Sequence, residues 1–209
     1  MAEIIPAIIG FQFSEVRDRL AQVEGLADWV QLDIMDGLFV PPYTWQNPED
    51  LNEVGGKAKI EAHLMVEQPE IVLRDWMNVV DRVIVHYEST ENLDEIVDAV
   101  TGSSVKLGIA LKLETPIESL IKYADSLSHV QLMGIAEIGY HGKPFDIRTL
   151  ERIETLRQKF PNATIAIDGG ITLETGKEAI RAGADALVVG SALWESEDVA
   201  HAFQEFKAL

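Results

Sequence analysis

Short runs of β-branched and other apolar residues alternate with amphipathic segments almost from one end of this chain to the other. The apolar runs have the length of strands, and the segments between them repeat apolar residues at helical spacing. Such alternation predicts a parallel sheet, because consecutive parallel strands are joined by a crossover that is usually helical. The predicted strands cover residues 3–9, 29–35, 59–65, 82–87, 104–112, 129–135, 164–169 and 185–190.

The predicted helices occupy most of the remaining chain. They cover residues 13–25, 47–55, 68–77, 92–100, 115–124, 145–160, 172–183 and 195–209, and the segment 47–55 has the weakest pattern. Units of about 25 residues that repeat about eight times predict an α/β chain closed into a (β/α)8 TIM barrel. We expect this barrel to be a single domain over residues 1–209. The alternative is an open doubly wound sheet, but its glycine-rich fingerprint after the first strand is missing.

The charge and composition of the chain exclude some classes of partner. The net charge of −18 argues against nucleic-acid binding, which needs a basic face, although a small anionic substrate could bind where the local potential is positive. The chain has no cysteine, so disulfides and thiolate metal sites are excluded, as is typical of a reducing compartment. Apolar runs fall short of the ~18 residues of a membrane span, and the first residues lack the basic region of a signal peptide. We therefore expect a cytoplasmic protein that binds no membrane.

Polar residues collect where the predicted strands end, which is where barrel enzymes place their active sites. In "DWVQLDIMDGLFVPP", Gln31 and Asp33 alternate, so both point to one face of their strand. Asp33, His63 and Asp168 come from the second, third and seventh strands, and such groups ligate divalent cations. Two carboxylates on opposite sides of a substrate could also move protons on its two faces. The alternative is that each side chain makes only a structural hydrogen bond.

Two glycine-containing turns follow the last two strands. Gly169-Gly170 and Gly190-Ser191 stand where barrels often bind phosphate, because glycine lets the backbone approach a ligand and helix starts present N–H groups. Tight turns need glycine in any case, so each pair alone carries little weight. Met35, Met65 and Met133 occupy comparable heights on three strands. They are either core filler or an apolar cover that excludes water from a reacting carbon.

At these residues the chain resembles the ribulose-phosphate 3-epimerase family. The matching segments are "LDIMDGLFVPP", "EAHLMVEQPE", "VHYE", "GIALKLETP", "IDGGI" and "GADALVVGSALW", in the same order over nearly the whole chain. The resemblance implies a barrel of the ribulose-phosphate-binding type that interconverts D-ribulose 5-phosphate and D-xylulose 5-phosphate through an enediolate. It also implies a divalent metal ion (Zn, Mn, Fe or Mg), a sugar-phosphate ligand and a homo-oligomer.

The resemblance also assigns roles to individual residues. Asp33 and Asp168 would be the acid/base pair and two of the metal ligands, with His63 as a third ligand and Gln31 in the place of a fourth. Met35, Met65 and Met133 would line the enediolate. The residues that would bind the phosphate or substrate are Gly139, Gly142, Gly169, Gly170, Gly190 and Ser191.

Several residues depart from the family pattern. Gln31 stands where the family usually has a histidine ligand, and an amide oxygen is a harder and weaker donor than imidazole. We therefore expect weaker metal binding, a shift from zinc towards manganese or magnesium, or no stable metal. Gly10 replaces a serine and would remove a hydroxyl from the site, and Lys112 replaces an asparagine. The loop "MGIAEIGYHGKPF" is one residue longer than usual and carries His141 and Lys143, which could help to neutralise a phosphate.

Other functions stay open at this point. A relative acting on a hexulose phosphate or another ketose phosphate would use the same proton chemistry. The orotidylate decarboxylase and hexulose-phosphate synthase group has similar barrels, but its Asp-x-Lys-x-x-Asp motif is absent, since "DIMDG" contains no lysine. The alternative outside enzymology is a divergent barrel that binds a sugar phosphate without turning it over.

Overall fold

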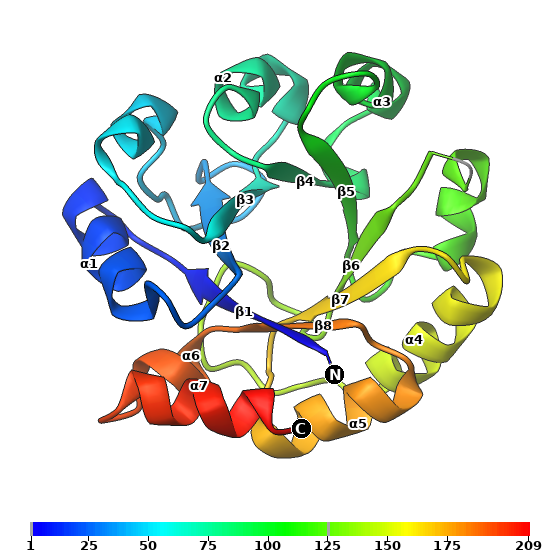
Figure 1. The fold of residues 1–209 in the computed structure, drawn as a ribbon. Helices are drawn as coiled ribbons and strands as arrows, with labels where there is room; N and C mark the ends of the chain where they lie inside the picture. The colour runs from blue at the N-terminus through cyan, green and yellow to red at the C-terminus, as the bar shows by residue number, and fades with distance from the viewer. Residues whose placement is uncertain (1, 125) are drawn as a thin grey trace.

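The computed structural model describes residues 2–124 and 126–209. Its strands form one closed parallel barrel in the order β1 to β8, ringed by helices (Figure 1). The predicted (β/α)8 barrel is therefore confirmed, and the alternative of an open sheet is wrong. The strands are β1 (Glu3–Ile8), β2 (Trp29–Met35), β3 (Lys59–Met65), β4 (Arg82–His86), β5 (Lys106–Leu111), β6 (His129–Met133), β7 (Thr164–Asp168) and β8 (Ala186–Val189).

The connections between the strands are helical, although not all are α-helices. The α-helices are α1 (Phe13–Val23), α2 (Leu73–Met77), α3 (Leu93–Val100), α4 (Arg148–Lys159), α5 (Leu173–Ala182), α6 (Ser191–Trp194) and α7 (Val199–Lys207). Short 3₁₀ helices cover Pro48–Glu53 (η1), Pro69–Ile71 (η2), Tyr87–Ser89 (η3) and Ile117–Tyr123 (η4). No helix in the described residues has the length and apolarity needed to cross a membrane.

Two predicted helices differ in type from the expectation. The segments 47–55 and 115–124 form the 3₁₀ helices η1 and η4 in place of α-helices. In η1 the buried residues are Pro48 and Leu51, and in η4 they are Ile117 and Leu120. Both pairs are three residues apart, and residues i and i+3 lie on one side of a 3₁₀ helix. A pair at this spacing is enough to anchor a short connection to the barrel.

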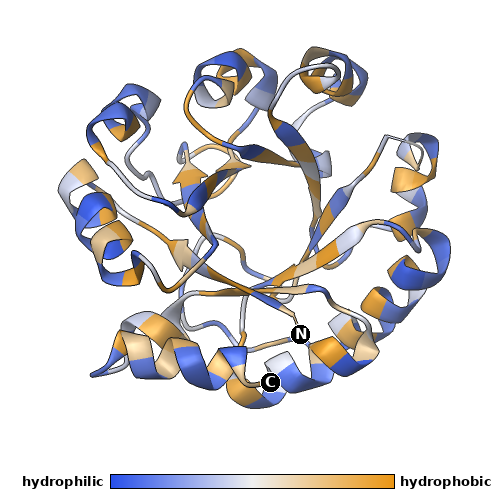
Figure 2. Cartoon of the chain, in the orientation of Figure 1, coloured by the Kyte–Doolittle hydropathy of each residue, from blue (hydrophilic) through white to orange (hydrophobic). Residues whose placement is uncertain are grey.

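The largest apolar cluster lies between the barrel wall and the surrounding helices. The strands are largely hydrophobic, and the helices alternate hydrophobic and hydrophilic residues, as expected of segments buried on one side only (Figure 2). Inside the barrel, a small cluster includes Val188, which is level with Asp168, and extends to Trp29 at the end where the strands begin. There the buried pair of Arg82 and Glu61 (Nη1 to Oε2, 2.5 Å) lies beside the Trp29 ring. The opposite end carries a second set of polar residues, among them Asp33 and Asp168.

The strand register stacks these polar residues in layers. On β2 and β3, Gln31 is level with Glu61, Asp33 with His63 and Met35 with Met65. On β6 and β7, Met133 is level with Asp168. Because alternate residues of a strand share a face, each pair on β2 and β3 points into the barrel one layer above the previous one. An acid and a histidine therefore lie below a layer of methionines at the carboxyl ends of the strands.

Candidate active site

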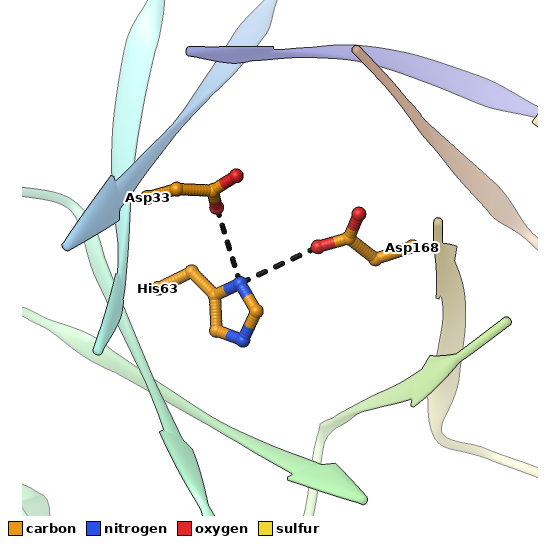
Figure 3. Close-up of side chains that lie close together, drawn as sticks. All are labelled: Asp33, His63 and Asp168. Atoms are coloured by element: carbon orange, nitrogen blue, oxygen red, sulfur yellow. Dashed lines mark hydrogen bonds and ion pairs between the residues drawn. The ribbon is translucent and has the colours of Figure 1, made fainter. Parts of the chain in front are cut away.

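Asp33, His63 and Asp168 converge inside the barrel although they come from three different strands (Figure 3). The Nδ1 atom of His63 lies 3.2 Å from Oδ1 of Asp33 and 3.3 Å from Oδ2 of Asp168. One potential ligand atom from each residue lies within 4.8 Å of the other two. All three residues are buried. The residues that the sequence singled out thus meet in one cluster that could hold a metal ion.

Gln31 lies between the two carboxylates. Its Nε2 atom donates to Oδ1 of Asp33 at 2.7 Å and to Oδ2 of Asp168 at 2.8 Å, and it lies 3.3 Å from Nδ1 of His63. The side chain is fully buried. Position 31, where the resemblance led us to expect a histidine ligand, therefore carries the residue that joins both carboxylates.

Gln131, on β6, belongs to the same cluster and was not identified from the sequence. Its Nε2 atom donates to Oδ2 of Asp168 at 2.9 Å and lies 3.3 Å from Nδ1 of His63. A signal was present, because β2 and β6 each contain the triplet Val-Gln-Leu, at residues 30–32 and 130–132. A glutamine in the middle of a buried strand needs a polar partner, and here the partner is the cluster.

Burial and mutual contacts set the charges in the cluster. Burial raises the pKa of Asp33, and the nearby charge of Asp168 adds to this effect, although the hydrogen bond from His63 opposes it. Burial alone would lower the pKa of His63, but the hydrogen bonds to Asp168 and Asp33 outweigh it and raise the pKa to about 9. Without a cation, an imidazolium therefore lies between the two acids.

A chain of hydrogen bonds continues from His63 to the rim of the barrel. Nε2 of His63 lies 2.9 Å from Nε2 of His86, and Nδ1 of His86 lies 3.2 Å from Oε2 of Glu88. Burial lowers the pKa of His86 to about 4. Burial would raise the pKa of Glu88, but the hydrogen bond with His86 outweighs it and the pKa falls to about 2. A protonated His63 therefore donates to a neutral His86, which in turn donates to an ionised Glu88.

This chain fixes the orientation of the His63 ring. With Nε2 of His63 committed to His86, Nδ1 faces the carboxylates and is the atom available to a cation. Partners of this kind orient metal-binding histidines and select their tautomer. No role was predicted for His86 or Glu88 from the sequence.

The three methionines form one apolar cluster at the open end of the barrel. Met35, Met65 and Met133 are buried, and the cluster also contains Val40, Ile135 and Ile138. Ile135 and Ile138 belong to the loop after β6, whereas Val40 belongs to the loop after β2. Apolar side chains from both loops therefore cover the polar layer.

A cavity of about 40 Å³ joins the acids to the glycine turns. It is lined by Asp33 and Asp168, by Met65 and Met133, and by every residue predicted to bind the phosphate or substrate: Gly139, Gly142, Gly169, Gly170, Gly190 and Ser191. His141, from the loop after β6, also lines it and approaches Gly190: a Cβ atom built on Gly190 would lie 2.7 Å from Nδ1 of His141. The predicted substrate-binding residues thus share one cavity.

Gly170 shows why this turn requires glycine. Its φ angle is +69°, and a Cβ atom there would lie 2.5 Å from the backbone nitrogen of Phe145. The turn after β7 therefore packs directly on the segment that leads to α4. Only a residue without a side chain allows this approach.

Three other departures from the family pattern lie outside the acid cluster. A Cβ atom on Gly10 would meet Cγ2 of Val16 in α1 at 2.6 Å, whereas Ala7 and Ile9 line the cavity on this side. The expectation that Gly10 removes a hydroxyl from the site is therefore wrong. The ammonium group of Lys112 lies 3.9 Å from the centre of the Phe39 ring, and Lys143 forms an ion pair with Glu137.

The fold and the site together define a (β/α)8 barrel with buried acids beside a glycine-lined cavity at the carboxyl ends of its strands. The model of the ribulose-phosphate 3 epimerase family matches residues 3–194. The chain belongs to the ribulose-phosphate 3-epimerase family.

Similar proteins in several organisms agree with this assignment. The chain is 30% identical to a ribulose-phosphate 3-epimerase of Eremothecium gossypii, over 93% of the chain and 87% of the relative. It is 31% identical to a chloroplastic ribulose-5-phosphate-3-epimerase of Arabidopsis thaliana, over 98% of the chain and 76% of the relative. It is also 31% identical to a ribulose-phosphate 3-epimerase of Mycobacterium bovis, over 95% and 89%.

Solved structures with little sequence identity share the fold. KGPDC from Streptococcus mutans, in complex with a sugar phosphate, superposes with a TM-score of 0.77 at 13% identity, over 99% of this chain and 96% of that one. A 3-hexulose-6-phosphate synthase superposes with a TM-score of 0.73 at 18% identity, over 99% and 98%. At these identities the similarity shows the fold alone.

Proposed function

We propose that the chain is a ribulose-phosphate 3-epimerase, which interconverts D-ribulose 5-phosphate and D-xylulose 5-phosphate. The observation that carries the proposal is that Asp33 and Asp168 reach one cavity from β2 and β7. The two carboxyl groups point towards each other from different parts of the barrel wall (Figure 3). Inversion at a carbon needs one group on each face of that carbon, and this pair supplies both.

The reaction moves one proton off C3 and another onto it. The carboxylate of one aspartate removes the C3 proton, and the electron pair moves towards the C2 carbonyl oxygen to form an enediolate. The second aspartate, protonated, then delivers its proton to the opposite face of C3. The two acids must therefore start in different protonation states, one as the base and the other as the proton donor.

The remaining predicted residues support this chemistry. The methionines would keep water from the enediolate, and the glycine turns would bind the phosphate through their backbone N–H groups. Asp33, His63 and Asp168 fit a divalent cation, since their donor atoms lie close together and two negative charges balance it. A cation bound there would supply stabilisation of the negative charge on the enediolate oxygens.

The function is tested by incubating the protein with D-ribulose 5-phosphate in heavy water, with and without Mn²⁺ or Zn²⁺. NMR would follow the loss of the C3 proton and the appearance of D-xylulose 5-phosphate. We expect both, and we expect the Asp33→Asn and Asp168→Asn variants to lose them, since an amide cannot exchange the proton. A wild-type protein that neither exchanges C3 nor forms product under any metal condition contradicts the proposal.

A second candidate is a barrel that binds a sugar phosphate without turnover. The observation that favours it is Gln31, whose amide group donates hydrogen bonds to both carboxylates. In this case sugar phosphates would bind and protect the protein from thermal unfolding, while no deuterium would enter C3 of D-ribulose 5-phosphate. Exchange at C3 without formation of D-xylulose 5-phosphate would instead indicate proton abstraction without inversion.

A further inference from the structure

Two glutamine side chains, and not one, face the acid cluster. Gln31 and Gln131 are both fully buried, and their Nε2 atoms donate to the same oxygen of Asp168 at 2.8 and 2.9 Å. Both Nε2 atoms also lie 3.3 Å from Nδ1 of His63. Gln31 thus contacts all three side chains that could ligate a cation, and Gln131 contacts two of them.

The oxygen atoms of these carboxamides need an explanation. Oε1 of Gln31 and Oε1 of Gln131 are buried and have no hydrogen-bond partner among the described residues. Rotation of a carboxamide by half a turn exchanges its oxygen and nitrogen with almost no change in shape. The oxygens would then face the carboxylates, which is unfavourable unless a positive charge lies between them.

The spacing of the donor atoms matches the coordination shell of a small cation. Five atoms form the cluster, namely one carboxamide atom from each glutamine, Nδ1 of His63 and one oxygen from each aspartate. Seven separations between these atoms run from 2.7 to 3.3 Å. Adjacent ligands of an octahedral cation with bonds of about 2.1 Å are about 3.0 Å apart. The five atoms therefore lie at the distances expected of ligands around one ion.

We propose that Gln131 is a ligand of the cation site, where its carboxamide oxygen acts together with that of Gln31. In the absence of a cation, the amide group of Gln31 joins the two carboxylates instead, and that of Gln131 donates to Asp168. The resulting set of four oxygens and one imidazole nitrogen favours Mn²⁺ or Mg²⁺ over Zn²⁺. This assignment deepens the proposed function, because it concerns the same site, but cation binding can be measured without any substrate.

The assignment is tested by the Mn²⁺ affinity of the purified, substrate-free protein. Electron paramagnetic resonance of the free ion measures this affinity. Gln131→Leu removes the donor and keeps an apolar side chain of similar size, and we expect its affinity to fall at least about tenfold. Gln131→Glu places a carboxylate oxygen at the same point and is expected to bind Mn²⁺ more tightly than the wild type.

Gln46→Leu is the matched control. Gln46 donates its amide to the carbonyl of Met35 at 2.7 Å and makes no hydrogen bond to the acids or to His63 among the described residues. Its loss should leave the Mn²⁺ affinity within twofold of wild type. If Gln131→Leu also stays within twofold, or if the wild type binds no Mn²⁺ at millimolar concentration, the assignment is overturned.

A second measurement avoids substitutions. The side-chain amide resonances of Gln31 and Gln131 in ¹⁵N-labelled wild-type protein should both move when Mg²⁺ is added, since both carboxamides turn. Amide resonances that stay in place while Mg²⁺ binds also overturn the assignment. Turnover of ribulose 5-phosphate is measured separately with the same preparations. A protein that binds the cation but shows no turnover contradicts the proposed function and leaves the assignment of Gln131 intact.

Discussion

The side chain at position 31 lies where it can affect the chemistry of the site. Gln31 reaches both Asp33 and Asp168, as a ligand between two carboxylates must. An amide offers a hard oxygen to a cation, whereas imidazole offers a softer nitrogen that zinc prefers. The identity of the bound metal should therefore depend on this residue.

The Gln31→His variant should retain more zinc through purification than the wild type. The imidazole would complete a set of two histidines and two carboxylates, which suits zinc. Metal content measured by mass spectrometry checks this, and Gln46→His, which adds a histidine outside the cluster, is the control. Tight and equal zinc content in the wild type and Gln31→His would show that the substitution at position 31 has no effect on the metal.

His129 should make stability fall with acid. Burial and the charges of Arg82 and Lys106 lower its pKa well below the usual value of 6.5, so the folded protein keeps the ring neutral. Below pH 6.5 the His129 ring takes up a proton in the unfolded chain but not in the folded protein. The contribution of the neutral ring to stability is therefore fully present above pH 6.5. As pH falls further, the contribution is lost by up to about 1.4 kcal/mol per pH unit.

Urea unfolding of His129→Leu at pH 7 and pH 5 tests this. The variant lacks the titrating group, so its free energy of unfolding should fall less between the two pH values than that of the wild type. Leucine also removes two ring nitrogens that are buried without a hydrogen-bond partner in the described residues. An equal fall in both proteins would rule out His129 as the cause.

At the level of elements, the sequence predicted the strands better than their connections. Parallel strands are buried on both sides, so they stand out as continuous apolar runs, and β2 and β3 have the predicted ends. The 3₁₀ helices η1 and η4 were predicted as α-helices, because two buried residues at three-residue spacing fit either type. The four-residue helix α6 was missed, since one turn has no periodicity to detect.

Part of the candidate site could also be predicted from the sequence. Asp33, His63 and Asp168 stand at strand ends, where a barrel gathers its reactive groups. Gln131, like Asp33 and His63, stands two residues before the end of its strand, but an amide carries no charge that marks it as reactive. Its partners His63 and Asp168 come from β3 and β7 and reach it only when the barrel closes. The chain from His63 to Glu88 depends in the same way on side-chain geometry that strand order alone does not define.

The turn after β7 gives a prediction at this scale. Gly170→Ala would place a methyl group 2.5 Å from the backbone of Phe145, at a φ of +69°. We expect a loss of about 1–3 kcal/mol in the free energy of unfolding beyond that of Gly142→Ala. Gly142 has a nearly equal φ of +71° but open space around it, so it controls for the backbone term. Urea unfolding of both variants measures the difference, and equal losses would mean that the contact with Phe145 is unimportant.

The whole molecule carries far more negative than positive charge. There are 35 acidic and 17 basic side chains, with a net charge of −18. Several of the acids have cationic partners at the surface, such as Asp94 with Lys122 and Asp185 with Arg157, but the excess remains. Like charges distributed over a compact surface repel each other and oppose folding.

Salt should therefore stabilise this protein. Raising the ionic strength from 0.01 to 0.1 M shortens the screening length from about 30 to about 10 Å, which weakens repulsion between distant acids. We expect the melting temperature to rise over this interval in KCl at pH 7. An uncharged osmolyte at equal osmolality controls for solvent effects, and a melting temperature that falls with salt would show that surface ion pairs outweigh the repulsion.

The cavity at the acids also has a consequence for how a substrate could arrive. Its volume of about 40 Å³ makes it a narrow cavity. The loop after β6 limits the space, since His141 approaches Gly190 and Gly139 approaches Met35. If the chain binds a sugar phosphate as proposed, we expect this loop to withdraw when the ligand enters and again when it leaves. The pace of each catalytic cycle would then depend on a backbone movement as well as on proton transfer.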